Sequence, residues 1–382
     1  MSQTLTTKTG TVDIVVFENS GISNISLNKK HRIVYADLLR IVTTFFVIVV
    51  HVTSGKVDNV PVTDQSWEFF NIFHGLSRWC VPVFFMLSGM VFLNPKNSIN
   101  AKTLFFKYIF RIVCALVFWG LLYGFFTALT ASFTSESSFT LSKLLLIPRG
   151  LLFGPPYYHL WYLYAIIALY VFTPVLRILV THMQRKHIEY YLILFIVLSI
   201  VIPCINHYLM LINPKYRISF GIPELNGYAG YFIAGYYFSR YDLSPKLKNT
   251  LYITALLLSI AALYITSIQS GVVHKPVRYL YGYSAPNVAL AAFALFVVFK
   301  SVFKNSPFKT KTADLITYLS SLTFGIFLIH PMFLKILSIN NIDAQSFTPI
   351  LSVPLLSLFL FLTCAVVTGF LKKIPGFGKY CI

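Results

Sequence analysis

Two ionisable residues, Arg40 and His51, interrupt an apolar run at positions 33–52 that is long enough to span a bilayer. Such groups are costly in hydrocarbon, so inside a spanning segment they usually mark a functional site. At 100° per residue, eleven positions bring the two onto one helix face, about 16 Å apart along the axis. Asp37 lies on the neighbouring part of this face and can pair with Arg40, either for the chemistry or only to neutralise its charge.

A cationic pair, Lys107 and Arg111, stands one helical turn apart at the start of another apolar segment. Two cations on one face can hold an anionic ligand. Basic residues also collect at the cytoplasmic ends of membrane spans for reasons of topology alone, so both interpretations stay open.

The composition decides the class of protein. Hydrophobic residues make up 57% of the chain and charged residues only 11%, and apolar stretches of about 20 residues recur along it. We therefore predict an all-α integral membrane protein with many passes, and we expect it in the cytoplasmic (inner) membrane. A β-barrel would instead show short segments of alternating polarity.

Hydropathy predicts about ten transmembrane helices. They are expected near 33–54, 79–93, 108–131, 158–179, 190–211, 227–239, 250–270, 284–303, 315–336 and 349–371. With both termini in the cytoplasm, every cytoplasmic segment carries at least three Lys or Arg, whereas the opposite loops carry fewer. The domain prediction is a polar N-terminal tail at 1–31, a membrane domain at 32–373 and a cytoplasmic C-terminal tail at 374–382.

The formal charge of +19 is explained by these cytoplasmic loop ends, so we do not expect nucleic-acid binding. The five cysteines are scattered without a CxxC pair or a His-rich partner, so we expect neither a disulfide framework nor a metal site. The glycines of the short sixth span, Gly227, Gly230 and Gly235, favour close helix packing.

Several segments resemble the membrane-bound acyltransferase-3 family. They are Asp37-Leu-Leu-Arg40 followed by His51, then SRWCVPVFFMLSGMVF at 77–92, YYHLWYLYAIIALYVFTPVLR at 157–177 and FGIFLIHP at 324–331. The resemblance covers roughly 32–373. It is greatest to the short, single-domain members, such as the O-acetyltransferase of enterobacterial common antigen.

The resemblance implies transfer of an acyl group, usually acetyl, from cytoplasmic acetyl-CoA to a hydroxyl of an extracytoplasmic glycan or lipid-linked oligosaccharide. Acetyl-CoA would be a cosubstrate, with no tightly bound cofactor. Arg40, Lys107 and Arg111 would hold its phosphates, because guanidinium and ammonium groups both bind phosphate with charge-assisted hydrogen bonds. His51 would act as general base or carry the acyl group transiently, and Arg40 and Asp37 would complete the catalytic set from the other end of the span.

Further polar and aromatic residues of these segments are candidates for substrate binding: Arg78, Ser88, His159, Trp161, Tyr162 and His330. Each also has a structural interpretation. Arg78 can extend to the interface, Ser88 can be part of a helix-packing pair with Gly89, and His159, Trp161 and Tyr162 can form an interfacial belt. His330 can bond a backbone carbonyl near Pro331.

A proton-coupled transporter or flippase for a glycan or small anion is the alternative function, since buried Arg, Asp and His also build translocation paths. No inverted repeat is evident, because the polar residues of the first spans have no counterparts among the last five. Acceptor specificity is expected in the outer loops at 130–156 and 213–226. The acceptor, the acyl group and the oligomeric state cannot be read from the sequence.

Overall fold

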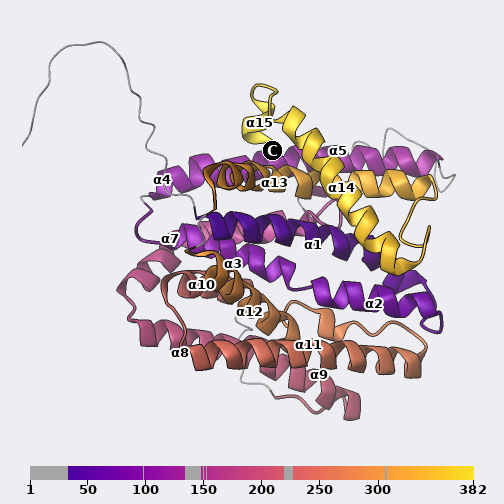
Figure 1. The fold of residues 1–382 in the computed structure, drawn as a ribbon, viewed down its shortest axis with the longest axis horizontal. Coiled ribbons are helices and arrows are strands. Elements are labelled where there is room, and N and C mark those ends of the chain that lie inside the picture. Colours follow the sequence, from indigo (N-terminus) through magenta and orange to yellow (C-terminus); the bar gives the residue numbers. More distant parts are fainter. Residues whose placement is uncertain are drawn as a thin grey trace, which may run out of the picture. The chain divides into compact units, whose positions relative to one another are not determined.

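A computed structural model describes residues 33–97, 99–133, 148, 150–151, 153–218, 227–305 and 308–382. The predicted N-terminal tail at 1–31 lies outside these residues, as do most of the outer loop at 130–156 and much of the loop at 213–226. Within the described residues the structure consists of helices, with no strand (Figure 1). The predicted all-α class is confirmed.

Within the same residues, nine helical stretches are long and apolar enough to cross a membrane. They are Val34–Asn59, Gln65–Phe92, Ala101–Ala131, Trp161–His182, Arg185–Ile212, Pro245–Val273, Tyr279–Phe303, Thr310–Ile339 and Pro349–Leu371. The predicted sixth span is present as α10 (Gly227–Arg240), which has 14 residues. At 1.5 Å per residue it is only about 21 Å long, shorter than the hydrocarbon core of a bilayer.

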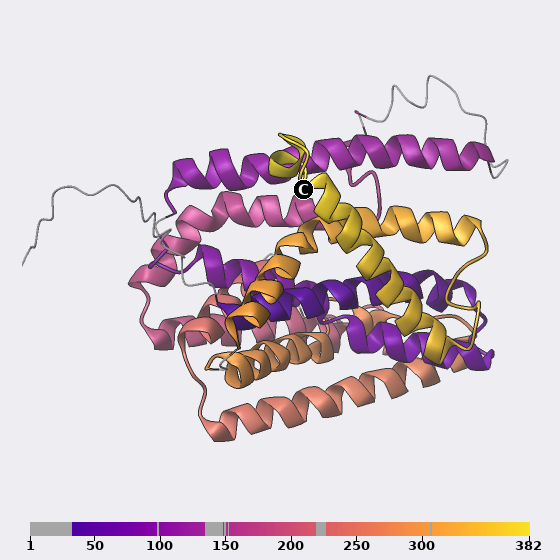
Figure 2. The same cartoon turned by 45° about the horizontal axis from the view of Figure 1, so that its top comes forward.

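Helix α1 (Val34–Asn59) lies among the other helices rather than at their edge (Figures 1 and 2). It packs against α2 (Gln65–Ser77) and α3 (Cys80–Phe92), and also against α12 (Pro286–Phe303), α13 (Thr310–Ile339) and α14 (Pro349–Leu371). Its residues belong to both apolar cores of the protein. The helix that carries Arg40 and His51 is therefore enclosed by protein.

The lipid-facing helices are apolar on the outside. On α11 (Pro245–Val273), large apolar side chains such as Ile253, Leu256, Leu257 and Ile260 are more than half exposed. A surface of this kind is unfavourable in water and suits hydrocarbon. Together with the number of apolar helices, it makes this a multi-pass membrane protein.

The second spanning stretch is broken between α2 and α3; α3 matches the short helix predicted near 79–93, and α2 was not predicted. Pro82 lies in the first turn of α3 and has no N–H, so it cannot continue the hydrogen-bond ladder of α2. Arg78 stands at the break. Its Nε donates to the carbonyl oxygen of Tyr281, 2.6 Å away, and its guanidinium lies 4.4 Å from the ring centre of Tyr283.

Helices α3 and α10 touch through their backbones. A Cβ at Gly89 would overlap the carbonyl group of Phe232, and a Cβ at Gly235 would overlap that of Met86. Both positions therefore require glycine for close approach rather than for a special backbone conformation. The predicted close packing is confirmed for Gly235 and Gly89.

Replacing Gly89 with Ala should destabilise the protein strongly, because a helix backbone cannot move aside as a side chain can. We expect the free energy of unfolding to fall by about 1–3 kcal/mol, the usual cost of overpacking. The measurement is the thermal denaturation of the detergent-purified protein. Gly271→Ala is the matched control, since a Cβ there meets nothing within 4 Å. Equal melting temperatures for the two variants would contradict the proposed contact.

Candidate active site

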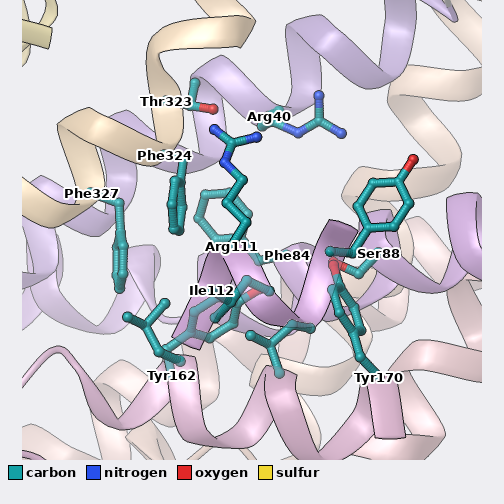
Figure 3. Close-up of a pocket in the computed structure, with 13 residues that line it drawn as sticks. Arg40, Phe84, Ser88, Arg111, Ile112, Tyr162, Tyr170, Thr323, Phe324 and Phe327 are labelled. Carbon is teal, nitrogen blue, oxygen red and sulfur yellow. The ribbon is translucent and has the colours of Figure 1, made fainter. Parts of the chain in front are cut away.

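A cavity of about 220 Å³ lies between α1, α3, α13, α7 (Trp161–His182) and the segment formed by η1 (Leu104–Ile109) and α5 (Phe110–Phe133) (Figure 3). We call it the arginine cavity, because Arg40 and Arg111 both line it. The other lining residues are aromatic, small polar or aliphatic. They are Phe84, Ser88, Tyr108, Ile112, Tyr162, Leu163, Ile166, Tyr170, Thr323, Phe324 and Phe327.

Arg40 is held in place by a carboxylate and a hydroxyl. Its Nη1 donates to Asp37 Oδ1 and to Ser320 Oγ, each at 2.9 Å, and Ser320 Oγ donates to Asp37 Oδ1 at 2.6 Å. Asp37 and Ser320 are almost fully buried. The predicted Asp37–Arg40 pair is confirmed. Because both contacts use Nη1, the other donors of the guanidinium are not engaged by these partners.

Arg111 enters the same cavity from α5. One of its terminal nitrogens donates to the carbonyl oxygen of Ile382, its Cζ lies 5.5 Å from the ring centre of Phe324, and its Nε has no hydrogen-bond partner among the described residues. Lys107, in the π-helical segment η1, is exposed and does not line the cavity. Of the predicted cationic pair, the structure therefore brings only Arg111 to Arg40's cavity.

Three histidine rings gather beyond the arginine cavity. The ring centres of His51 and His330 lie 5.2 Å apart, and those of His159 and His330 lie 5.8 Å apart. Tyr158 adds a fourth ring, 4.9 Å from His51. We call these four residues the histidine cluster. Among the described residues, no group of three or more His, Cys, Asp or Glu side chains is arranged to hold a metal ion.

His330 has a fixed orientation inside α13. Its Nδ1 lies 3.1 Å from the carbonyl oxygen of Ile326, and since a carbonyl only accepts, Nδ1 carries the proton. The predicted backbone hydrogen bond of His330 is present. Its Nε2 is buried and has no partner within the described chain. A buried acceptor without a partner is uncommon, and it leaves a lone pair for another group.

Phe327 and Tyr162 stand between the arginine cavity and the histidine cluster. Both line the cavity, with ring centres 5.6 Å apart, and the ring of Phe327 is 5.3 Å from that of His159 and 6.2 Å from that of His330. The cavity therefore ends at aromatic rings whose other side is the cluster.

His51 also lines a second cavity, of about 320 Å³, at the C-terminal end of α1. We call it the His51 cavity. Its polar lining comprises Lys56, Asn59, Ser338, Asp343 and Gln345 besides His51. The histidine cluster thus has one cavity on each side, along the same helix.

The predicted substrate-binding residues fall into three groups. Ser88 and Tyr162 line the arginine cavity, while His330 lies beside His51 and His159 lies beside His330. Trp161 instead stacks 5.5 Å from Tyr283, the ring that Arg78 also covers, and neither Trp161 nor Arg78 lines either cavity.

Sequence reasoning missed Ser320 and most of the lining of the His51 cavity. Ser320 is 283 positions from Asp37, and an isolated serine in an apolar helix carries no signal of its own. Phe327 and Tyr158 lie within the segments 324–331 and 157–177, but nothing in those segments distinguished them from ordinary core aromatics.

Removing the carboxylate beneath Arg40 should cost more stability than removing the hydroxyl. In Ser320→Ala the ion pair stays, and we expect a loss of about 1–3 kcal/mol for the two hydrogen bonds of the hydroxyl, one with Arg40 and one with Asp37. Asp37→Asn leaves a partly buried cation without its counter-charge, so its melting temperature should fall further than that of Ser320→Ala. Thermal denaturation in detergent compares the two variants. The reverse order would mean that Asp37 does not stabilise Arg40.

Comparison with known proteins gives one result. The family model described as "Acyltransferase domain" matches residues 33–370, which include both cavities and the histidine cluster. No curated protein and no solved structure matches the chain.

Proposed function

The chain belongs to the membrane acyltransferase-3 family, and from this premise we propose that it transfers an acetyl group from cytoplasmic acetyl-CoA to a hydroxyl of an extracytoplasmic cell-surface glycan. The observation that carries the proposal is the placement of His51 between two cavities, one of which contains two arginines. An acyltransferase must bring two substrates to one group from different directions. The His51 cavity reaches the imidazole directly, whereas the rings of Phe327 and Tyr162 separate the arginine cavity from the cluster, so the donor thioester would have to pass between them.

The arginine cavity suits the donor. Arginine binds phosphate oxygens through two parallel charge-assisted hydrogen bonds, and Arg40 and Arg111 are both available from its wall. The aromatic and aliphatic lining suits the methylene and dimethyl groups of a thin pantetheine arm. The positive-inside pattern of the loops supports an orientation in which this cavity faces the cytoplasm, with both termini on that side.

The histidine cluster suits the transfer step. The acceptor hydroxyl oxygen attacks the thioester carbonyl carbon while His51 takes the hydroxyl proton. The C–S bond then breaks, and the proton returns to the CoA sulfur as the thiol leaves. We favour this general-base role because the ring of His51 reaches the cavity from which an acceptor approaches. Transient acylation of His51 is the other route by which the same ring can act.

Acetyl-CoA binding should depend on Arg111 more than on Lys107. Arg111→Ala removes a guanidinium from the cavity wall, and we expect binding weakened about 10- to 100-fold, the effect of one or two charge-assisted contacts. Isothermal calorimetry on detergent-purified protein measures it. Lys107→Ala is the matched surface control, with an expected change below about twofold. An equal loss in both variants would instead support a joint phosphate site. A folded wild type that binds no acetyl-CoA would contradict the proposal and favour the transporter.

His51→Gln should abolish transfer but keep donor binding. General-base catalysis contributes about 10²–10⁴-fold, so transfer of labelled acetyl to membrane glycans should fall by that factor. Calorimetry should show acetyl-CoA affinity within about threefold of wild type, and an unchanged melting temperature controls for folding. Transfer at the wild-type rate would exclude His51 from the reaction. Acid-quenched wild type, examined for acetyl-histidine by mass spectrometry, distinguishes the acyl-carrier route from the general-base route.

A further inference from the structure

The His51 cavity has a polar wall that is balanced in charge. Lys56 and Asp343 are the charged residues of the lining, and His51 contributes an imidazole ring. Lys56 Nζ lies 2.6 Å from Asp343 Oδ2. Lys56 Nζ also donates to Gln345 Oε1 at 2.8 Å. The ammonium group therefore already has two acceptors. An anionic ligand would have to compete with Asp343 for it, and a cationic ligand would have to compete with Lys56.

The segment between α13 and α14 that supplies this wall is held by its own hydrogen bonds. The backbone N–H of Gln345 donates to Asp343 Oδ1 at 2.7 Å, and the N–H of Asp343 donates to Ser346 Oγ at 2.9 Å. Ala344, between them, is only 1% exposed. Asp343 thus binds Lys56 with one carboxylate oxygen and its own turn with the other, which fixes the position of the pair.

The rest of the lining combines amide and hydroxyl groups with aliphatic surface. Asn59 lines the cavity and donates one hydrogen bond from its amide nitrogen to the carbonyl of Gly55 at 2.8 Å, and its amide oxygen is a further acceptor. Ser338 adds a hydroxyl, and Val52, Pro61 and Leu334 add apolar faces. Neutral donors and acceptors beside an apolar face match a pyranose ring, which has hydroxyls at its edge and C–H groups on its faces.

From these features we infer that the His51 cavity binds one uncharged, hydroxyl-bearing sugar residue of the acceptor, and that Lys56, Asp343 and Gln345 determine its specificity. The inference rests on the proposed function, because it places the acceptor hydroxyl beside His51. A volume of about 320 Å³ is at the lower end of the range for small-molecule sites, about 300–1,000 Å³, which suits a single ring rather than a longer oligosaccharide.

Gly55 allows this cavity to be filled without disturbing the fold. It lines the cavity within α1, and a Cβ built there meets nothing within 4 Å. A leucine at this position is a better helix former than glycine and would project into the space proposed for the sugar. Gly271 in α11 is also free of neighbours within 4 Å but lies outside the cavity. Gly271→Leu is therefore the matched control.

The test uses saturation-transfer NMR on the detergent-purified full chain without acetyl-CoA, with methyl glucoside as the neutral probe and methyl glucuronide as the anionic one. Wild type and Gly271→Leu should saturate methyl glucoside, with at least about tenfold weaker binding of methyl glucuronide, and Gly55→Leu should lose the signal. Retained signal in Gly55→Leu, equal binding of both probes, or no signal from methyl glucoside in wild type would each overturn the inference.

Asp343→Asn tests the specificity assignment separately. The amide keeps an oxygen for the turn but removes the charge that balances Lys56, so preference should shift toward methyl glucuronide by about tenfold, the effect of one charge-assisted contact. An unchanged preference would remove Asp343 from the specificity determinants. Failure of the proposed function would give a different result. A folded protein that binds methyl glucoside but shows no acetyl-CoA binding in calorimetry would support the sugar site and contradict the acyl donor.

Discussion

The structure depends on one constraint, which is that the ionisable residues of α1 cannot face hydrocarbon. An unpaired charge in the membrane interior is expensive, so Arg40 needs a counter-charge and His51 needs a protein or aqueous surround. The fold meets both needs by packing other helices around α1. Asp37 and Ser320 hold the guanidinium, and the imidazole lies against Tyr158, just before α7, and His330 of α13. The other features of the site follow from this central helix.

The same arrangement separates binding from chemistry. The arginine cavity lies toward the N-terminal half of α1 and the His51 cavity lies at its C-terminal end, with aromatic and imidazole rings between them. A highly charged donor and a sugar acceptor need different surroundings, and one helix supplies both from residues about 16 Å apart. Transfer at His51 requires that the thioester pass the rings of Phe327 and Tyr162. The nucleotide itself can stay at the far end.

The sequence predicted features that depend on residues close together in the chain. It did not predict contacts between residues far apart in the chain. The Asp37–Arg40 pair is three positions apart on one helix, and hydropathy located most spans, so these predictions are confirmed. The Arg40–Ser320 and Lys56–Asp343 contacts join residues 280 and 287 positions apart, and one sequence does not reveal such contacts. Helix α3 matches the span predicted near 79–93, whereas α2 was missed because its polar residues, such as Glu68 and Asn71, lower the hydropathy before the break. For Lys107 a local signal was misleading. Helical spacing predicted that it shares a site with Arg111, but its side chain lies at the surface.

The contact between α3 and α10 has a consequence for how this protein can change over evolutionary time. Most packed positions tolerate a larger residue if a neighbouring side chain becomes smaller in compensation. Gly89 and Gly235 face carbonyl groups of the opposite helix, and every amino acid carries the same carbonyl. No substitution at Phe232 or Met86 can therefore make room. These two glycines are independent of the side chains around them, while those side chains are free to vary.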